Sequence, residues 1–152
     1  MSTPAAIEAA PTSAGPITLF ARAVGGLLIA LGVLGLVPGI TADYDQLGFY
    51  RTGAELFGLF ATSVVSSSLL ILFGATALAF SGSVRQSHKT VCWIGLTLLT
   101  LAVAGAGLLV NSPSELKPVN AGSNWLHLVL GLALLAGAGA SRAKHVSDDD
   151  VF

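Results

Sequence analysis

The stretch ITLFARAVGGLLIALGVLGLV, residues 17–37, decides the fold of this chain. It is apolar throughout except for Arg22, and it is about as long as a helix must be to cross the hydrocarbon core of a bilayer. Arg22 lies near the start of the stretch, where a long basic side chain can reach the lipid headgroups. The stretch therefore predicts a membrane-spanning helix that ends before Pro38 and Gly39.

Three more apolar stretches follow, at residues 56–80, 91–110 and 124–140. They are uniformly apolar and do not alternate at every second residue, so they predict helices and not the strands of a membrane barrel. The sequence thus predicts an all-α integral membrane protein, a four-helix bundle of up-down topology over residues 17–140. Residues 1–16, rich in Ala, Pro, Ser and Thr, predict a disordered tail.

Composition supports this reading and excludes several classes of protein. The 152 residues are 53% hydrophobic and 10% charged, whereas a soluble domain carries about 25% charged residues. The net charge of −1 gives no basic footprint for nucleic acid. A single cysteine allows neither an internal disulfide nor a cysteine-based metal site. We expect no cofactor and no metal, and we expect the lipid bilayer and either a membrane-protein partner or a homo-oligomer as partners.

Basic residues set the expected orientation. They lie at the start of the first stretch, between the second and third, and after the fourth: Arg22, Arg85, Lys89, Arg142 and Lys144. In an up-down bundle these places share one side, and Lys and Arg mark the cytoplasmic side of a membrane protein. We therefore expect both termini in the cytoplasm, with residues 141–152 forming a cytoplasmic tail.

The two halves of the chain resemble each other. SSLLILFGATAL, residues 67–78, aligns without gaps with NWLHLVLGLALL, residues 124–135, and the alignment pairs Gly74 with Gly131. This pattern predicts a parallel repeat of two helical hairpins. The alternative is a chance likeness between membrane helices that are all rich in Leu, Ala and Gly.

Three segments carry a resemblance to a known family: PGITADYDQL after the first stretch, AELFGLF opening the second and NAGSNWLHLVLG opening the fourth. In their order and spacing they resemble a family of small four-helix bacterial membrane proteins known only as a domain of unknown function. The resemblance covers about residues 22–140 and implies a multi-pass protein of the bacterial plasma membrane, without an assigned activity. The family pattern has an Asn-x-x-His motif in the second helix too, where this chain has Ser67 and Leu70.

Asn124 and His127 are the polar residues that open the fourth stretch. They are three residues apart and so share a helix face, beside Trp125 at the expected outer boundary. One interpretation is structural, with Asn124 as the helix cap and His127 bonded to a neighbouring segment. The other is a ligand or proton site, because an ionisable residue within a membrane span is by default a functional candidate.

The first loop holds the second group of polar residues. Thr52 to Glu55, TGAE, fits a capping box that would start the second helix. Asp43, Tyr44 and Asp45 precede it, and they predict either a solvated turn or the roof of a shallow outer pocket floored by His127.

Two functions follow as hypotheses. The first is a non-enzymatic structural or accessory subunit that acts through helix contacts, because the sequence shows no complete catalytic constellation. The alternative is a small-molecule or lipid-binding module, redox-linked or transporting, with its site at the outer membrane face. Its candidate ligand-binding residues are Asn124, His127, Asp43, Tyr44 and Asp45.

Overall fold

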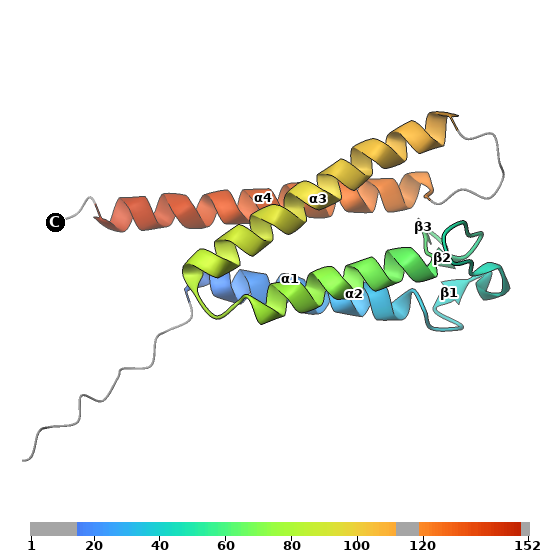
Figure 1. Ribbon diagram of the computed structural model, residues 1–152, viewed down its shortest axis with the longest axis horizontal. Coiled ribbons are helices and arrows are strands. Elements are labelled where there is room, and N and C mark those ends of the chain that lie inside the picture. The colour runs from blue at the N-terminus through green and yellow to red at the C-terminus, as the bar shows by residue number, and fades with distance from the viewer. Residues whose placement is uncertain (1–14, 112–118, 150–152) are drawn as a thin grey trace, which may run out of the picture.

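The computed structural model describes residues 15–111 and 119–149 and confirms the all-α helical bundle (Figure 1). The elements in chain order are α1 (Pro16–Leu34), β1 (Thr41–Ala42), a 3-10 turn (Tyr44–Gln46), β2 (Glu55–Leu56), β3 (Phe60–Ala61), α2 (Val64–Ala79), α3 (Val84–Asn111) and α4 (Ala121–Asp149). Successive helices run up and down, so the start of α1 and the end of α4 lie at one end of the bundle and the strands at the other (Figure 1). Of the expected disordered tail, residues 1–14 lie outside the described residues.

Helix α1 begins and ends where its sequence allows. Pro16 occupies the first turn, where its missing N–H costs nothing. The helix ends at Leu34, three residues before the expected end, and Gly35 is its C-cap. The Thr41 hydroxyl donates to the carbonyl oxygens of Leu34 at 3.2 Å and Gly35 at 3.1 Å. These bonds satisfy carbonyls that a helix end would otherwise leave without a partner.

Helix α2 starts at Val64, well after the expected position 56. The residues between form β2 and β3 of an antiparallel sheet with the order β1-β2-β3, in which Leu56 pairs with both Thr41 and Phe60. The predicted capping box at Thr52 and Glu55 is therefore wrong, because Glu55 lies in β2. The residues that cap α2 are Ser63, whose hydroxyl accepts from the Ser66 N–H, and Ser66, whose hydroxyl accepts from the Ser63 N–H.

The last two helices are longer than their apolar segments. Helix α3 begins at Val84, where 91 was expected, because the polar residues 84–90 continue the same helix. Helix α4 begins at Ala121 and continues to Asp149, so much of the expected tail is helical. Hydropathy predicts the part of a helix that lies in lipid, and it does not predict a polar extension into water.

Three helices, α1, α3 and α4, are long and apolar enough to cross a membrane, and α2 is a shorter apolar helix. The 16 residues of α2 rise about 24 Å, less than the hydrocarbon thickness of about 30 Å. Large apolar side chains also cover the outside of the helices: Leu19 on α1, Leu72 on α2, Val103 on α3 and Leu132 on α4 are all exposed. Soluble proteins rarely expose so many large apolar side chains to water, so this surface indicates a membrane protein.

In each of the two hairpins, α1 with α2 and α3 with α4, the helix backbones approach closely at a pair of glycines. A methyl group on Gly25 would lie 2.9 Å from the Gly74 carbonyl oxygen, and one on Gly95 would lie 3.1 Å from the Gly131 carbonyl oxygen. Conversely, a methyl group on Gly74 would lie 2.5 Å from the Gly25 carbonyl oxygen, and one on Gly131 would lie 2.9 Å from the Gly95 carbonyl oxygen. Gly74 and Gly131, paired by the sequence alignment, thus hold equivalent places, and this agreement supports the internal repeat.

The helix caps repeat as well. Asn120 caps α4 as Ser63 caps α2: its Oδ1 accepts from the Ser123 N–H at 2.7 Å, and the Ser123 hydroxyl accepts from the Asn120 N–H at 3.0 Å. The alignment that pairs Gly74 with Gly131 also pairs these two capping boxes. The repeat therefore extends from the helix starts to the middle of the hairpins.

Candidate functional site

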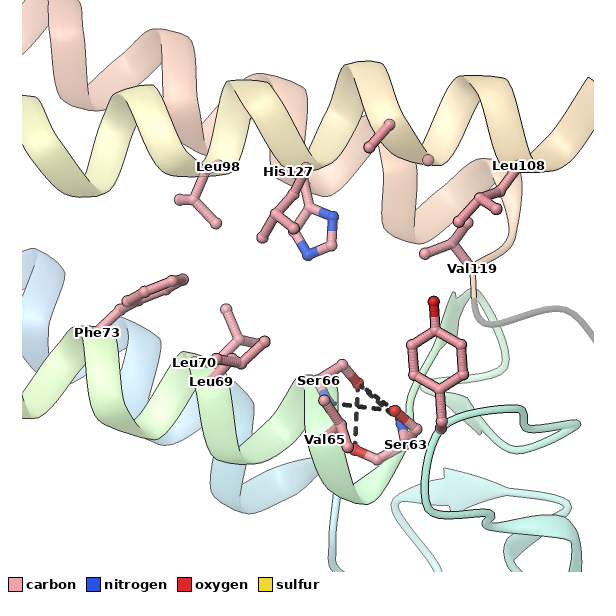
Figure 2. Close-up of a pocket in the computed structure, with 14 residues that line it drawn as sticks. Ser63, Val65, Ser66, Leu69, Leu70, Phe73, Leu98, Leu108, Val119 and His127 are labelled. Atoms are coloured by element: carbon pink, nitrogen blue, oxygen red, sulfur yellow. Dashed lines mark hydrogen bonds between the residues drawn. The ribbon is translucent and has the colours of Figure 1, made fainter.

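A cavity of about 180 Å³ lies between α2 and the α3–α4 hairpin, toward the end of the bundle that carries the strands (Figure 2). Most of its wall is apolar and comes from α2 and α3. The lining residues are Tyr50, Ser63, Val65, Ser66, Leu69, Leu70, Phe73, Leu98, Leu101, Ala104, Gly105, Leu108, Val119 and His127. No lining residue carries a full charge, with the imidazole counted in its neutral form. The cavity is thus suited to a neutral and largely apolar occupant.

His127 contributes a polar ring to this mostly apolar cavity. Its ring projects from α4 toward α2, between Leu98 and Val119 (Figure 2). Its Nδ1 is buried and has no hydrogen-bond partner among the described residues. His127 also borders a second, smaller cavity of about 30 Å³ on the side of Leu31 and Leu56. A buried imidazole nitrogen without a partner is uncommon in a folded protein and points to a group that the protein alone does not supply.

The two serine hydroxyl groups at the cavity wall are already engaged. The Ser63 and Ser66 side chains bond to each other at 3.2 Å and form the two halves of the α2 capping box. They lie at the lower edge of the cavity, with their bonds directed along the helix start (Figure 2). His127 is therefore the lining residue inside the cavity with a buried hydrogen-bonding atom that is still unused.

Asn124 holds a different place from the one expected. It lies in the first turn of α4 and does not cap it, because Asn120 is the cap and accepts the Asn124 N–H at its carbonyl oxygen. The Asn124 Oδ1 is buried against Gly105, where a methyl group would overlap it, and it has no hydrogen-bond partner among the described residues. Asn124 does not line the cavity, although Gly105 does. It packs α3 against α4, while its neighbour Trp125 is 64% exposed.

The repeat explains why the Asn124 Oδ1 lacks a partner. Ser67 is the equivalent of Asn124 in the first hairpin, and its hydroxyl bonds to the Thr62 hydroxyl at 2.9 Å. The residue equivalent to Thr62 is Val119, which offers Asn124 no such bond. Leu70, the equivalent of His127, lines the same two cavities as His127. The cavity therefore lies between two equivalent positions of the hairpins, Leu70 and His127, of which only His127 is polar.

The structure does not bring the candidate acids of the first loop to this cavity. Asp43 and Asp45 are exposed, and the backbone of Asp43, at the start of the 3-10 turn, is in the left-handed region with φ of 47°. The Tyr44 hydroxyl donates to the Leu36 carbonyl oxygen at 3.0 Å and so ties the loop to the end of α1. The loop residue that does line the cavity is Tyr50.

One interpretation of the sequence placed His127 at a pocket, but sequence reasoning missed the rest of the cavity wall. Tyr50 lies in the short motif GFYR of the first loop and gave only the general signal of an aromatic residue near a membrane boundary. Phe73 and Leu98 carried no signal, because each lies within a uniformly apolar stretch. Within the described parts of the chain, no three His, Cys, Asp or Glu side chains gather as a metal site would require.

Replacing His127 with leucine is expected to stabilise the empty protein by about 1 kcal/mol, because it removes a buried nitrogen that has no partner. The unfolding midpoint in detergent measures the effect. Ser67→Ala is the matched control at the equivalent of Asn124: it breaks the satisfied bond to Thr62 and should destabilise the protein. A clear loss of stability in His127→Leu would mean that the imidazole has a partner within the folded chain.

Residues 18–139 match a protein family described as Domain of unknown function (DUF4383). No curated protein and no solved structure matches the chain.

Proposed function

Since this chain belongs to the DUF4383 family, which has no assigned activity, we propose its function from the geometry around His127. The protein is a membrane-embedded binding module that holds a small neutral molecule in the cavity between its two hairpins. The observation that carries this proposal is the buried, unpartnered Nδ1 of His127 in the wall of that cavity. A buried atom of this kind without a partner lowers the stability by about 1–3 kcal/mol, and a bound hydrogen-bonding group would remove this penalty.

The ligand would reach the site from the bilayer. Ala104 lines the cavity and is exposed on α3, and Leu108 lines it with 37% of its surface exposed. These residues lie on the outer surface of an apolar span, so the cavity opens toward lipid. A molecule that dissolves in the membrane can therefore enter between the hairpins without crossing the polar loops.

We place the site in the outer half of the bacterial plasma membrane, with both termini in the cytoplasm. Arg22, Arg85 and Lys89 are at the end of the bundle where α1 begins, and positive charge favours the cytoplasmic side. The cavity is toward the opposite end, near the strands. Cysteine labelling from outside intact cells at Asp45→Cys, with labelling at Gly82→Cys only after lysis, would support this orientation.

A role as an accessory subunit is the second candidate. It is favoured by Gly26 on α1 and Gly139 on α4, where an added methyl group would meet nothing within 4 Å. Small residues on a lipid-facing surface allow another helix to approach closely. Crosslinking from these two positions to a second membrane protein, without any retained small molecule in the purified chain, would favour this role over ligand binding.

The binding proposal is tested by filling the cavity. In Ala104→Phe the new ring enters the cavity, so the variant should retain at least about tenfold less of the compound that copurifies with the wild-type protein. Solvent extraction and mass spectrometry of the purified protein measure this amount. Ala106→Phe is the matched control, because Ala106 is exposed on the same helix and does not line the cavity. Equal amounts of every extracted compound in wild type and both variants would refute the proposal.

A further inference from the structure

The size of the cavity limits the ligand to about one ring. An apolar protein cavity of about 150 Å³ takes up benzene, and this one is about 180 Å³. It therefore accommodates a six-membered ring with one or two small substituents and is too small for a fused multi-ring system held entirely inside. Leu98 and Phe73 bound it from opposite helices, so the space is flanked by flat or branched apolar groups (Figure 2).

The chemistry of the wall limits the ligand further. The lining residues include no ionised side chain, so a charged ligand would have no counterion in a site surrounded by lipid. Among the described residues, His127 Nδ1 is the buried polar contact of the cavity that is still available, while Tyr50, Ser63 and Ser66 contribute the other polar groups of the lining. Neutral imidazole has one donor nitrogen and one acceptor nitrogen. A hydroxyl group both donates and accepts, so it can pair with this nitrogen in either tautomer.

From these observations, and resting on the proposed function, we infer that the ligand is a neutral ring compound bearing a hydroxyl group, of the phenol type, with the hydroxyl bonded to His127 Nδ1. The ring lies among the apolar residues of α2 and α3, where Leu70 stands at the place equivalent to His127. Because the wall around Leu70, Phe73 and Leu98 is apolar, the site recognises one polar end of the ligand and leaves its other end in apolar surroundings.

The inference is tested with 4-fluorophenol and 4-fluorotoluene, two probes of the same shape that differ in a hydroxyl or a methyl group. Fluorine-19 NMR titrations are made on the full chain in detergent, and the signal obtained with Ala104→Phe is subtracted as partition into micelles. We expect saturable binding of 4-fluorophenol that is about tenfold weaker in His127→Leu, as the loss of one buried hydrogen bond predicts. We expect 4-fluorotoluene to bind His127→Leu at least as well as the wild type.

A conservative variant separates hydrogen bonding from shape. His127→Gln keeps a hydrogen-bonding side chain and should recover part of the preference for 4-fluorophenol, whereas His127→Leu should not. Titrations of 4-alkylphenols distinguish a free compound from the ring of a longer lipid: binding that persists as the chain lengthens indicates a lipid whose tail leaves between the hairpins. Loss of binding with a longer chain indicates a free ring compound, and either result supports a hydroxyl-bearing ring.

Two results would overturn the inference. If both probes bind equally to the wild type and to His127→Leu, the cavity holds an apolar group and the hydroxyl class is wrong, while the binding function stands. If neither probe shows binding above the Ala104→Phe signal, the ring class is wrong. The proposed binding function itself is refuted only if solvent extraction also finds no compound that the wild type retains in a larger amount than Ala104→Phe.

Discussion

Replacing Gly74 with alanine is expected to destabilise the bundle by about 1–3 kcal/mol, the range seen when extra atoms are forced into a packed interior. The added methyl group would lie 2.5 Å from the Gly25 carbonyl oxygen and 2.7 Å from Ile29 Cγ1. The first of these atoms belongs to the backbone of α1, so it cannot turn aside as a side chain can. The two helices must separate, and contacts along the whole hairpin weaken. Denaturation by SDS in mixed micelles, followed by circular dichroism, measures the loss.

Two further alanine variants make this experiment specific. Gly26 adjoins Gly25 in the sequence, but a methyl group there would meet nothing within 4 Å, so Gly26→Ala should cost no stability. Gly131→Ala, at the equivalent of Gly74, would place its methyl group 2.8 Å from Leu99 Cγ and 2.9 Å from the Gly95 carbonyl oxygen. It should destabilise the second hairpin in the same way. Equal stability of Gly74→Ala and Gly26→Ala would contradict the close approach of α1 and α2.

Asn120→Ala is expected to destabilise the protein by about 2–4 kcal/mol, because this side chain combines a helix cap with a link between distant segments. Its Oδ1 caps α4 at the Ser123 N–H. Its Nδ2 donates to Glu55 Oε1 at 2.8 Å and to the Leu59 carbonyl oxygen at 3.0 Å, which holds the β2–β3 hairpin against the start of α4. The variant should lower the unfolding midpoint and increase proteolytic cleavage near residue 58.

The repeat supplies the control for this variant. Ser63 caps α2 in the place equivalent to Asn120, and Ser63→Ala should cost only about 1 kcal/mol, the usual value of a cap. Asn120→Ser keeps a capping oxygen and removes the donor to Glu55 and Leu59, so it should leave α4 intact but still expose the β2–β3 hairpin to protease. If Asn120→Ala and Ser63→Ala lose the same stability, the link to the β2–β3 hairpin contributes nothing.

The helices could be predicted from the sequence because lipid imposes a simple rule on each of them. A span must be apolar over its length, so residues 17–37, 91–110 and 124–140 gave helices close to their observed positions. This rule did not predict the start of α2. Leu56 and Phe60 continue the apolar stretch, but they pair with each other in strands, and the turn between them places Phe57 at φ of 54° and Gly58 at φ of 67°. Composition cannot distinguish a short apolar hairpin from another helical turn.

The site was predictable in one residue and unpredictable in its surroundings. His127 could be singled out because an ionisable side chain is rare in a membrane span. A pocket beside it was one of the two interpretations of the sequence, but the residues of the opposite wall could not be predicted, because a cavity depends on how far apart α2 and α3 lie. Asn124 was expected to cap α4, but Asn120 does so, and either asparagine is an acceptable cap by type. The bond from Asn120 to Glu55 joins segments far apart in the chain, which no local pattern indicates.

The matching glycine contacts also have a consequence for biogenesis. Within each hairpin the two helices approach closely at a glycine pair, Gly25 with Gly74 and Gly95 with Gly131. Helices α1 and α2 are complete by residue 79, so their contact needs nothing that the ribosome adds afterwards. The first hairpin can therefore enter the membrane and close as a unit during translation, and the second can then assemble beside it. In that order of assembly, the seam where the two units meet, which holds the cavity, forms last.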